Sequence, residues 1–313
     1  MTRASAAWLF PGQGAQYVGM AASLLARHET VRRLYQAARE RTGVDFALLS
    51  SEGPREELVK TSNTQPAIYL HSVALALLLR ERGWRPAAVA GHSLGEYSAL
   101  AAAGWLDPLD GLALVRRRGE LMYQAGLDWP GTMAAVIGAA PELVEECCRL
   151  ATAEGEVAQP ANFNCPGQIA ISGSLAGVER TTALLKERGV RLVKRLDVSG
   201  AFHSPLMEAA REGLLRELAD VALQPGVAPL YCNVTGRRVE DAGQIRTLLG
   251  RQLTETVRWQ GAMESLAADG HREALELGPG KVLSGLMQRI DGEFRVRPVD
   301  TADELEALWQ EGS

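Results

Sequence analysis

The chain has 313 residues, of which 46% are hydrophobic and 23% charged, and its formal net charge is -5. This length and balance suit a soluble globular protein with one large domain and a smaller one attached. The negative charge argues against general nucleic-acid affinity, and the longest apolar stretch, residues 66–79, is too short to span a bilayer. Four cysteines without a paired CxxC motif predict reduced thiols and no metal site, and Met1–Phe10 lacks a signal-peptide core, so we expect a cytoplasmic protein.

The first part of the chain alternates short apolar runs with longer helical patterns. Such alternation is typical of an α/β fold with a mainly parallel sheet. The predicted elements are a strand at 6–10, helical segments at 19–41 with a break near 28–30, a helix at 65–82, a strand at 87–91, a helix ending near Gly104 and a helix beginning at Asp107 and Pro108.

The pattern changes between residues 131 and 198. Here the predicted order is strand 132–137, helix 141–150, strand 156–163, strand 168–174, helix 176–188 and strand 190–198. A βαββαβ order is the ferredoxin-like arrangement. We therefore predict a small ferredoxin-like subdomain at 129–199, inserted into a large α/β-hydrolase-like catalytic domain formed by residues 1–128 and 200–313.

The large domain resumes after this insertion. Its predicted elements are a helix at 204–221, a strand at 229–234, two helices across 244–268, a strand at 274–277 and a helix at 282–290. Because the insertion interrupts the large domain, we expect a cleft between the two units, which is a common place for a ligand site.

Ser93 stands out in Gly91-His92-Ser93-Leu94-Gly95, between a predicted buried strand and a segment rich in helix-forming residues. A glycine-framed serine at a strand-to-helix turn is typical of a nucleophile elbow. An ordinary turn with a serine cap has the same pattern. The rest of the chain must therefore supply a base, an oxyanion site and a substrate pocket.

The candidate base is His203, which lies where the chain returns from the small subdomain to the large one. That position borders the expected cleft, although a structural histidine at a helix start fits the pattern equally well. The other histidines have simpler interpretations: a solvated residue at a helix break (His28), a packed core residue (His71), a positioning neighbour of Ser93 (His92) and a surface-turn residue (His271).

Two further segments carry groups suited to an acyl substrate. The loop Pro11-Gly12-Gln13-Gly14 has neither dinucleotide nor P-loop spacing, so it is either a flexible turn or a source of backbone N–H groups for an oxyanion, together with Leu94. In the run 116–118, successive arginines point about 100° apart on a helix, so at most one can enter a buried pocket and bind a carboxylate.

Five blocks of the sequence together carry a family resemblance: FPGQGAQ at 10–16, GHSLGE at 91–96, NFNCPGQ at 162–168, GAFHSPLM at 200–207 and ELGPGKVL at 276–283. In this order they resemble malonyl-CoA:acyl carrier protein transacylases, members of the acyltransferase family of fatty acid and polyketide synthesis. The resemblance covers about residues 8–290, and one departure from it is Cys165, where serine is common.

The resemblance implies a role for each matching residue. Ser93 would be the nucleophile, His203 its base, and the backbone carbonyl of Gln252 the group that orients the histidine. The backbone N–H groups of Gln13 and Leu94 would form the oxyanion hole. Five side chains would bind or line the substrate site: Arg118, which would hold the malonyl carboxylate, and His92, Met122, Asn164 and Phe202.

The implied reaction is ping-pong transfer of malonyl from coenzyme A to the phosphopantetheine thiol of acyl carrier protein, supplying fatty acid biosynthesis. It needs no cofactor, and we expect a monomer with malonyl preference, because Phe202 leaves little space for an α-methyl group. Three alternatives stay open at this point: an acyl-thioester or ester hydrolase, a trans-acting acyltransferase of a polyketide synthase, and a non-catalytic carrier-binding module. The acidic carrier protein would dock on a basic surface, and one cluster of basic residues in the small subdomain is the candidate. An ordinary solvated face of a helix and a strand explains this cluster equally well. Its residues are Lys186, Arg188, Arg191, Lys194 and Arg195.

Overall fold

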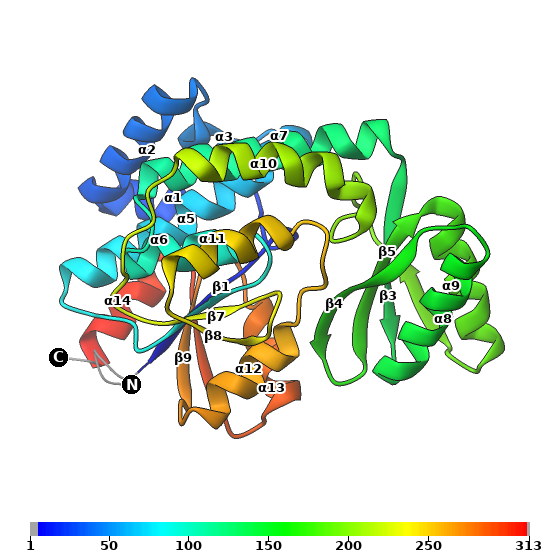
Figure 1. Cartoon of the computed structure of the whole chain (residues 1–313). Helices are drawn as coiled ribbons and strands as arrows, with labels where there is room; N and C mark the ends of the chain where they lie inside the picture. Colours follow the sequence, from blue (N-terminus) through cyan, green and yellow to red (C-terminus); the bar gives the residue numbers. More distant parts are fainter. Residues whose placement is uncertain (1–5, 312–313) are drawn as a thin grey trace.

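A computed structural model describes residues 6–311, in which a six-stranded sheet forms the centre of the larger unit (Figure 1). Its strands lie in the order β10-β9-β1-β2-β7-β8, and only the pair formed by β7 and β8 is antiparallel. The strands are β1 (Ala7–Phe10), β2 (Val89–Gly91), β7 (Leu230–Cys232), β8 (Arg237–Val239), β9 (Glu273–Leu277) and β10 (Arg295–Val299). The predicted mainly parallel sheet is confirmed.

Both faces of this sheet are covered by helices, as its alternating side chains require. Trp8 and Phe10 of β1 pack into one apolar cluster, whereas Ala7 and Leu9 pack into another on the opposite face. Helices α12 (Trp259–Ala268) and α13 (Val282–Ile290) contribute to the second cluster. The helices that contribute to the first are α1 (Ala22–Arg27), α2 (Glu29–Thr42), α3 (Phe46–Glu52), α4 (Arg55–Leu58), α5 (Thr61–Glu81), α6 (Gly95–Ala103), α7 (Pro108–Asp128), α10 (Glu208–Asp220), α11 (Ala242–Arg251) and α14 (Ala302–Glu311).

The smaller unit is a four-stranded antiparallel sheet with its own apolar cluster. The strand order is β4-β5-β3-β6, and the chain order is β3 (Gly131–Ile137), α8 (Pro141–Ala153), β4 (Ala158–Cys165), β5 (Gln168–Ser174), α9 (Leu175–Glu187) and β6 (Leu192–Arg195). The predicted βαββαβ order is confirmed. The predicted limits of the two units, 1–128 with 200–313 and 129–199, stay predictions, and their outer ends at residues 1–5 and 312–313 lie outside the described residues, as does the start of Met1–Phe10.

Several elements were not predicted from the sequence. Strands β8 and β10 lie at the two edges of the large sheet, where arginines and a proline are tolerated and the apolar pattern of a buried strand is absent. Helices α3, α4 and α14 were also missed. The predicted helix 204–221 divides into the 3₁₀ turn η1 (Pro205–Met207) and α10.

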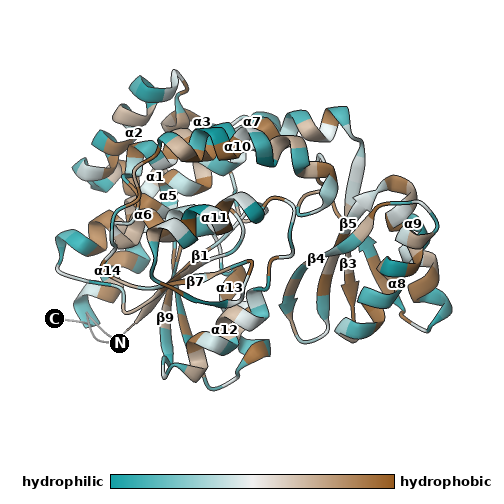
Figure 2. Ribbon diagram, viewed as in Figure 1, coloured by the Kyte–Doolittle hydropathy of each residue, from teal (hydrophilic) through white to brown (hydrophobic). Residues whose placement is uncertain are grey.

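Hydropathy follows this arrangement. Brown, apolar ribbon is concentrated on the strands at the centre of the large sheet, whereas the outer helices alternate brown and teal (Figure 2). Within residues 6–311, no helix has the length and apolar character needed to cross a membrane.

Candidate active site

Ser93 lies on a sharp turn between β2 and α6, with φ at 51°. The turn is tight enough that a Cβ added to Gly95 would lie 2.1 Å from the carbonyl oxygen of Phe10, so only glycine fits there. Asn233 holds the turn from outside: its Oδ1 accepts from the Ser93 N–H at 2.7 Å and its Nδ2 donates to the Gly91 carbonyl at 2.7 Å. These contacts keep Ser93 in a backbone region that residues other than glycine rarely occupy.

The His203 imidazole lies directly against this serine. Its Nε2 is 2.8 Å from Ser93 Oγ, and its Nδ1 is 2.7 Å from the backbone carbonyl of Gln252. A carbonyl oxygen can only accept, so Nδ1 carries the hydrogen and Nε2 is left to accept the serine proton. Burial, reinforced by the positive charge of Arg118, lowers the pKa of His203 to about 3, so the ring is neutral and able to act as a base near neutral pH.

The backbone of His203 is also left-handed, with φ at 58°, and a side chain of the smaller unit holds it. Gln159, on β4, donates from Nε2 to the His203 carbonyl at 2.6 Å and to the Thr254 carbonyl at 2.9 Å. Ser204 Oγ closes the turn by donating to the Ala201 carbonyl at 2.6 Å. The loop that carries the base therefore depends on contacts from β4 and from the segment after Gln252.

Arg118, on α7, is the one arginine of the 116–118 run that enters the site, with 1% of its side chain exposed. Its guanidinium donates to Gln65 Oε1 at 2.6 Å, to Gln252 Oε1 at 2.9 Å and to Ser93 Oγ at 3.2 Å. The Nε–H has no partner among the described residues. The guanidinium is thus a buried cation beside the serine with donor capacity left for a substrate carboxylate.

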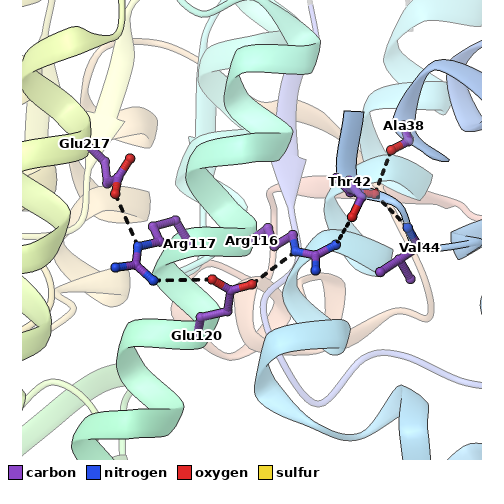
Figure 3. A network of polar contacts seen from close by, with 7 residues as sticks. All are labelled: Ala38, Thr42, Val44, Arg116, Arg117, Glu120 and Glu217. Atoms are coloured by element: carbon purple, nitrogen blue, oxygen red, sulfur yellow. Dashed lines mark hydrogen bonds and ion pairs between the residues drawn. The ribbon is translucent and has the colours of Figure 1, made fainter. Parts of the chain in front are cut away.

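The two preceding arginines face away from the site, as the helical spacing predicts. Arg117 pairs with Glu217 and Glu120, and Arg116 pairs with Glu120 and donates to the Thr42 carbonyl (Figure 3). These are surface ion pairs of small energetic weight.

The loop after β1 brings the Gln13 backbone to the elbow. A Cβ on Gly12 would lie 2.5 Å from the His92 carbonyl, so the two turns touch, and Gln13 Nε2 donates to Thr61 Oγ1 at 3.2 Å. Within residues 6–311, the N–H groups of Gln13 and Leu94 donate to no protein acceptor. Leu94 is the N-cap residue of α6, and the dipole of this helix favours negative charge at its N-terminus.

A cavity of about 390 Å³ joins these groups. All of the predicted site residues except Gln252 line it: Gln13, His92, Ser93, Leu94, Arg118, Met122, Asn164, Phe202 and His203. Gln252 is fully buried behind the histidine and the arginine. His92 does not contact Ser93 Oγ; its Nε2 lies 2.8 Å from Asn164 Oδ1, as expected of a positioning residue. A second hollow, of about 520 Å³ between α8 and α12, contains none of these side chains.

The remaining histidines lie away from the site. His71 is fully buried, with Nε2 2.8 Å from Asp300 Oδ1, and His271 directly follows the turn after α12, edge-on to Tyr231. The predicted solvation of His28 is wrong: the ring is half-buried and packs edge-on against Trp309, 5.9 Å between centroids. The C-terminal helix α14, which was not predicted, supplies that tryptophan.

Four side chains that hold the site were missed from the sequence: Gln65, Glu96, Gln159 and Asn233. Asn233 directly follows β7, and site residues gather at the carboxyl ends of parallel strands, so topology could have indicated it. Glu96 is the last residue of the block at 91–96 that contains Ser93, so its place in the sequence could also have indicated it. Nothing local distinguishes the two glutamines.

Comparison with known proteins shows the family to which this chain belongs. The acyl transferase domain model matches residues 7–298. The chain is 40% identical over 304 residues to a malonyl CoA-acyl carrier protein transacylase of Bacillus subtilis, covering 97% of this chain and 96% of that one, and 42% identical over 285 residues to one of Escherichia coli, covering 91% and 92%.

Solved structures agree with these matches. A malonyl-CoA:acyl carrier protein transacylase from Xanthomonas oryzae superposes with a TM-score of 0.94 at 44% identity and covers 99% of both chains. A malonyl-transacylase in complex with its type II PKS acyl-carrier protein superposes with a TM-score of 0.93 at 37% identity, covering 98% of this chain and 99% of that one.

Proposed function

The chain belongs to the acyl transferase family as a malonyl-CoA:acyl carrier protein S-malonyltransferase, and we propose that it transfers malonyl by a ping-pong route through a malonyl-Ser93 ester. The observation that carries this mechanism is the Ser93 Oγ to His203 Nε2 contact of 2.8 Å beside a buried arginine. A nucleophile, a neutral base and a carboxylate-binding cation therefore meet in one cavity.

In the first half-reaction, Ser93 Oγ attacks the thioester carbonyl of malonyl-CoA while His203 Nε2 takes the hydroxyl proton. The oxyanion forms toward the N–H groups of Gln13 and Leu94, and each such donor is worth about 2.7–4 kcal/mol. The carbon–sulfur bond then breaks, and coenzyme A leaves as the thiol with the proton from His203. The second half-reaction runs these steps in reverse with the phosphopantetheine thiol of the carrier.

The Gln252 carbonyl occupies the position that an aspartate has in a triad. It fixes the histidine tautomer but adds no negative charge to stabilise an imidazolium. With the cation of Arg118 also nearby, the ring returns its proton readily to the leaving thiol.

Arg118 selects the acyl group in this mechanism. A malonyl carboxylate would accept from the guanidinium, whereas an acetyl group would leave a buried cation without its partner. Phe202, which also lines the cavity, restricts the space beside the α-carbon and supports malonyl over methylmalonyl. His92, Met122 and Asn164 complete the lining.

The experiment that tests this function follows radiolabelled malonyl-CoA in a single turnover, with and without acyl carrier protein. We expect a labelled protein ester that passes to the carrier, and Ser93→Ala should abolish the label and lower the transfer rate by about 10⁴-fold or more. Ser98→Ala, in the same helix region, is the matched control. Release of the label mainly to water in the presence of the carrier would instead establish a hydrolase, and transfer that survives in Ser93→Ala would establish a non-catalytic binding role.

We further propose that the carrier docks on the basic patch of the smaller unit. Lys186, Arg188, Arg191, Lys194 and Arg195 are all exposed, although Arg188 is paired with Glu146 at 2.7 Å. Lys194→Glu with Arg195→Glu should raise the KM for the carrier and leave the malonyl-CoA half-reaction unchanged. An unchanged KM for the carrier would show that the carrier does not dock on this patch.

The remaining assignments follow from the same chemistry. Exchange of a thioester between two thiols is redox-neutral, and the serine and histidine supply nucleophile and base, so we propose that no cofactor takes part. We propose a cytoplasmic monomer that supplies fatty acid biosynthesis. The complex with a type II PKS carrier makes a polyketide partner the second candidate, and kcat/KM values measured with carriers of both kinds decide between them.

A further inference from the structure

Glu96 is a buried acid that the mechanism above does not use. It is 1% exposed and lies on α6, one turn after the nucleophile. Its Oε1 accepts from the backbone N–H of Asn233 at 3.0 Å, and its Oε2 accepts from Gln252 Nε2. The carboxylate thus touches the two residues that hold Ser93, His203 and Arg118 in place, but none of those three directly.

The contact with Glu96 contributes to the orientation of the Gln252 side-chain amide. Gln252 Nε2 faces three acceptors, Glu96 Oε2, the Ser93 carbonyl at 3.0 Å and Asn233 Oδ1 at 3.3 Å, and Glu96 is the one of them that can carry a negative charge. The amide oxygen is thereby turned to Arg118 Nη2 at 2.9 Å. A reversed amide would present N–H groups to the guanidinium, which has only donors itself.

Asn233 links Glu96 to the elbow in the same way. While its backbone N–H is held by the carboxylate, its side chain bridges the Ser93 N–H and the Gly91 carbonyl. One carboxylate therefore connects the serine turn to the arginine through two amides.

We propose that Glu96 is a positioning residue for malonyl recognition: as a carboxylate it orients the Gln252 amide so that Arg118 is held by amide oxygens and presents its free donors to the substrate carboxylate. This inference rests on the proposed function and adds to it a residue that controls specificity without touching the substrate. Glu96 makes no hydrogen bond to Ser93 Oγ or His203, so the contact between these two side chains does not pass through it.

The ionisation of Glu96 supports this role. Burial raises its pKa to about 7, so it changes charge near neutral pH. The titratable groups that face it are Arg118 on α7, Cys232 on β7 and its neighbour Tyr97 on α6. When protonated, one Glu96 oxygen becomes a donor, so the carboxyl group loses its charge and part of its capacity to accept from the Asn233 and Gln252 N–H groups, and the amide is held less firmly.

The test compares Glu96→Gln with the wild-type protein, using the rates of Ser93 acylation by malonyl-CoA and by acetyl-CoA across about pH 6 to 8.5. At the alkaline end, we expect Glu96→Gln to raise the KM for malonyl-CoA and to lower the preference for malonyl over acetyl, each by about 10-fold, the effect of one hydrogen bond. The acetyl rate should fall by a smaller factor than the malonyl rate, because an acetyl group has no carboxylate for Arg118 to bind. At the acid end the two proteins should converge, because wild-type Glu96 is then protonated.

Glu276→Gln is the matched control, since Glu276 is also a fully buried glutamate but caps α13 through the N–H groups of Leu283 and Ser284. An equal loss for both acyl groups in Glu96→Gln would show a structural role and overturn the inference. If that variant fails to fold, the wild-type preference for malonyl must still rise with pH through about 7, and a flat profile overturns the inference as well. These outcomes differ from failure of the proposed function itself, in which the wild-type protein would form no malonyl ester at all.

Discussion

Two turns carry the reacting groups of this protein, and they reach the same unusual backbone conformation in different ways. Ser93 and His203 are the two non-glycine residues with positive φ among residues 6–311. The serine turn is shaped mainly by close backbone packing, since Gly91 and Gly95 pack against each other and against β1, and Asn233 adds two hydrogen bonds to it. The histidine turn is held mainly by Gln159 and Gln252, about fifty residues away on either side.

This difference explains why one turn is easy to recognise and the other is not. Local packing demands glycine at fixed spacing, and that demand appears in the sequence as a motif. Long-range hydrogen bonds need only a suitable partner at the right place in the fold. They therefore require no fixed motif in the sequence around His203. The comparison can be tested by disturbing each turn separately.

The largest effect is expected from Gly95→Ala. The new methyl group would meet the Phe10 carbonyl oxygen at 2.1 Å, where backbone rather than a mobile side chain must move, so we expect a loss of more than about 4 kcal/mol of unfolding free energy. Gly200→Ala in the histidine turn meets its nearest atom at 3.2 Å and should cost about 1–3 kcal/mol. Urea unfolding measures both, and equal losses would contradict a difference between the turns.

Arg118→Ala should have the next largest effect, on specificity rather than folding. We expect the preference for malonyl-CoA over acetyl-CoA to fall by about 100-fold or more, because the site then lacks the cation that selects a carboxylate. Arg117→Ala removes only surface ion pairs and should change the preference by less than about 2-fold. Similar effects of the two variants would place the carboxylate site elsewhere.

Gln159→Ala tests the histidine turn alone. Loss of both hydrogen bonds from β4 should let the His203 backbone relax, lowering kcat by about 10-fold while the free energy of unfolding falls by about 1–3 kcal/mol. Gln260→Ala, which loses one exposed bond to Glu264, is the control. An unchanged kcat would mean that the His203 turn keeps its conformation without the hydrogen bonds from Gln159.

The smallest change is expected in the charge of His203 on acidification. Its pKa of about 3 keeps the imidazole neutral, so ring chemical shifts measured by NMR should stay constant down to about pH 5. Because the folded-state pKa lies below that of the unfolded chain, the contribution of this residue to stability is full above about pH 6.5 and is lost as the pH falls toward 3. A ring that titrates near pH 6.5 would contradict the burial of the base.

The sequence by itself determined the two-sheet architecture and the main reacting groups of this protein. Short apolar runs predicted the buried strands, and helical periodicity predicted the helices between them. The βαββαβ order predicted the smaller unit. The glycine spacing indicated Ser93, two of the five blocks contain Gln13 and His203, and the family resemblance that the blocks carry implied Arg118. Edge strands β8 and β10 escaped because solvent-facing edges impose little apolar pattern.

Tertiary structure alone decided how these groups are held. The family resemblance implied Arg118, but only the fold shows that its helix face, and not that of Arg116 or Arg117, meets the cavity. The polar contacts of Glu96, Asn233, Gln65 and Gln159 join segments between about forty and one hundred and forty residues apart. A hydrogen bond depends on distance and direction in space, which only the folded chain defines.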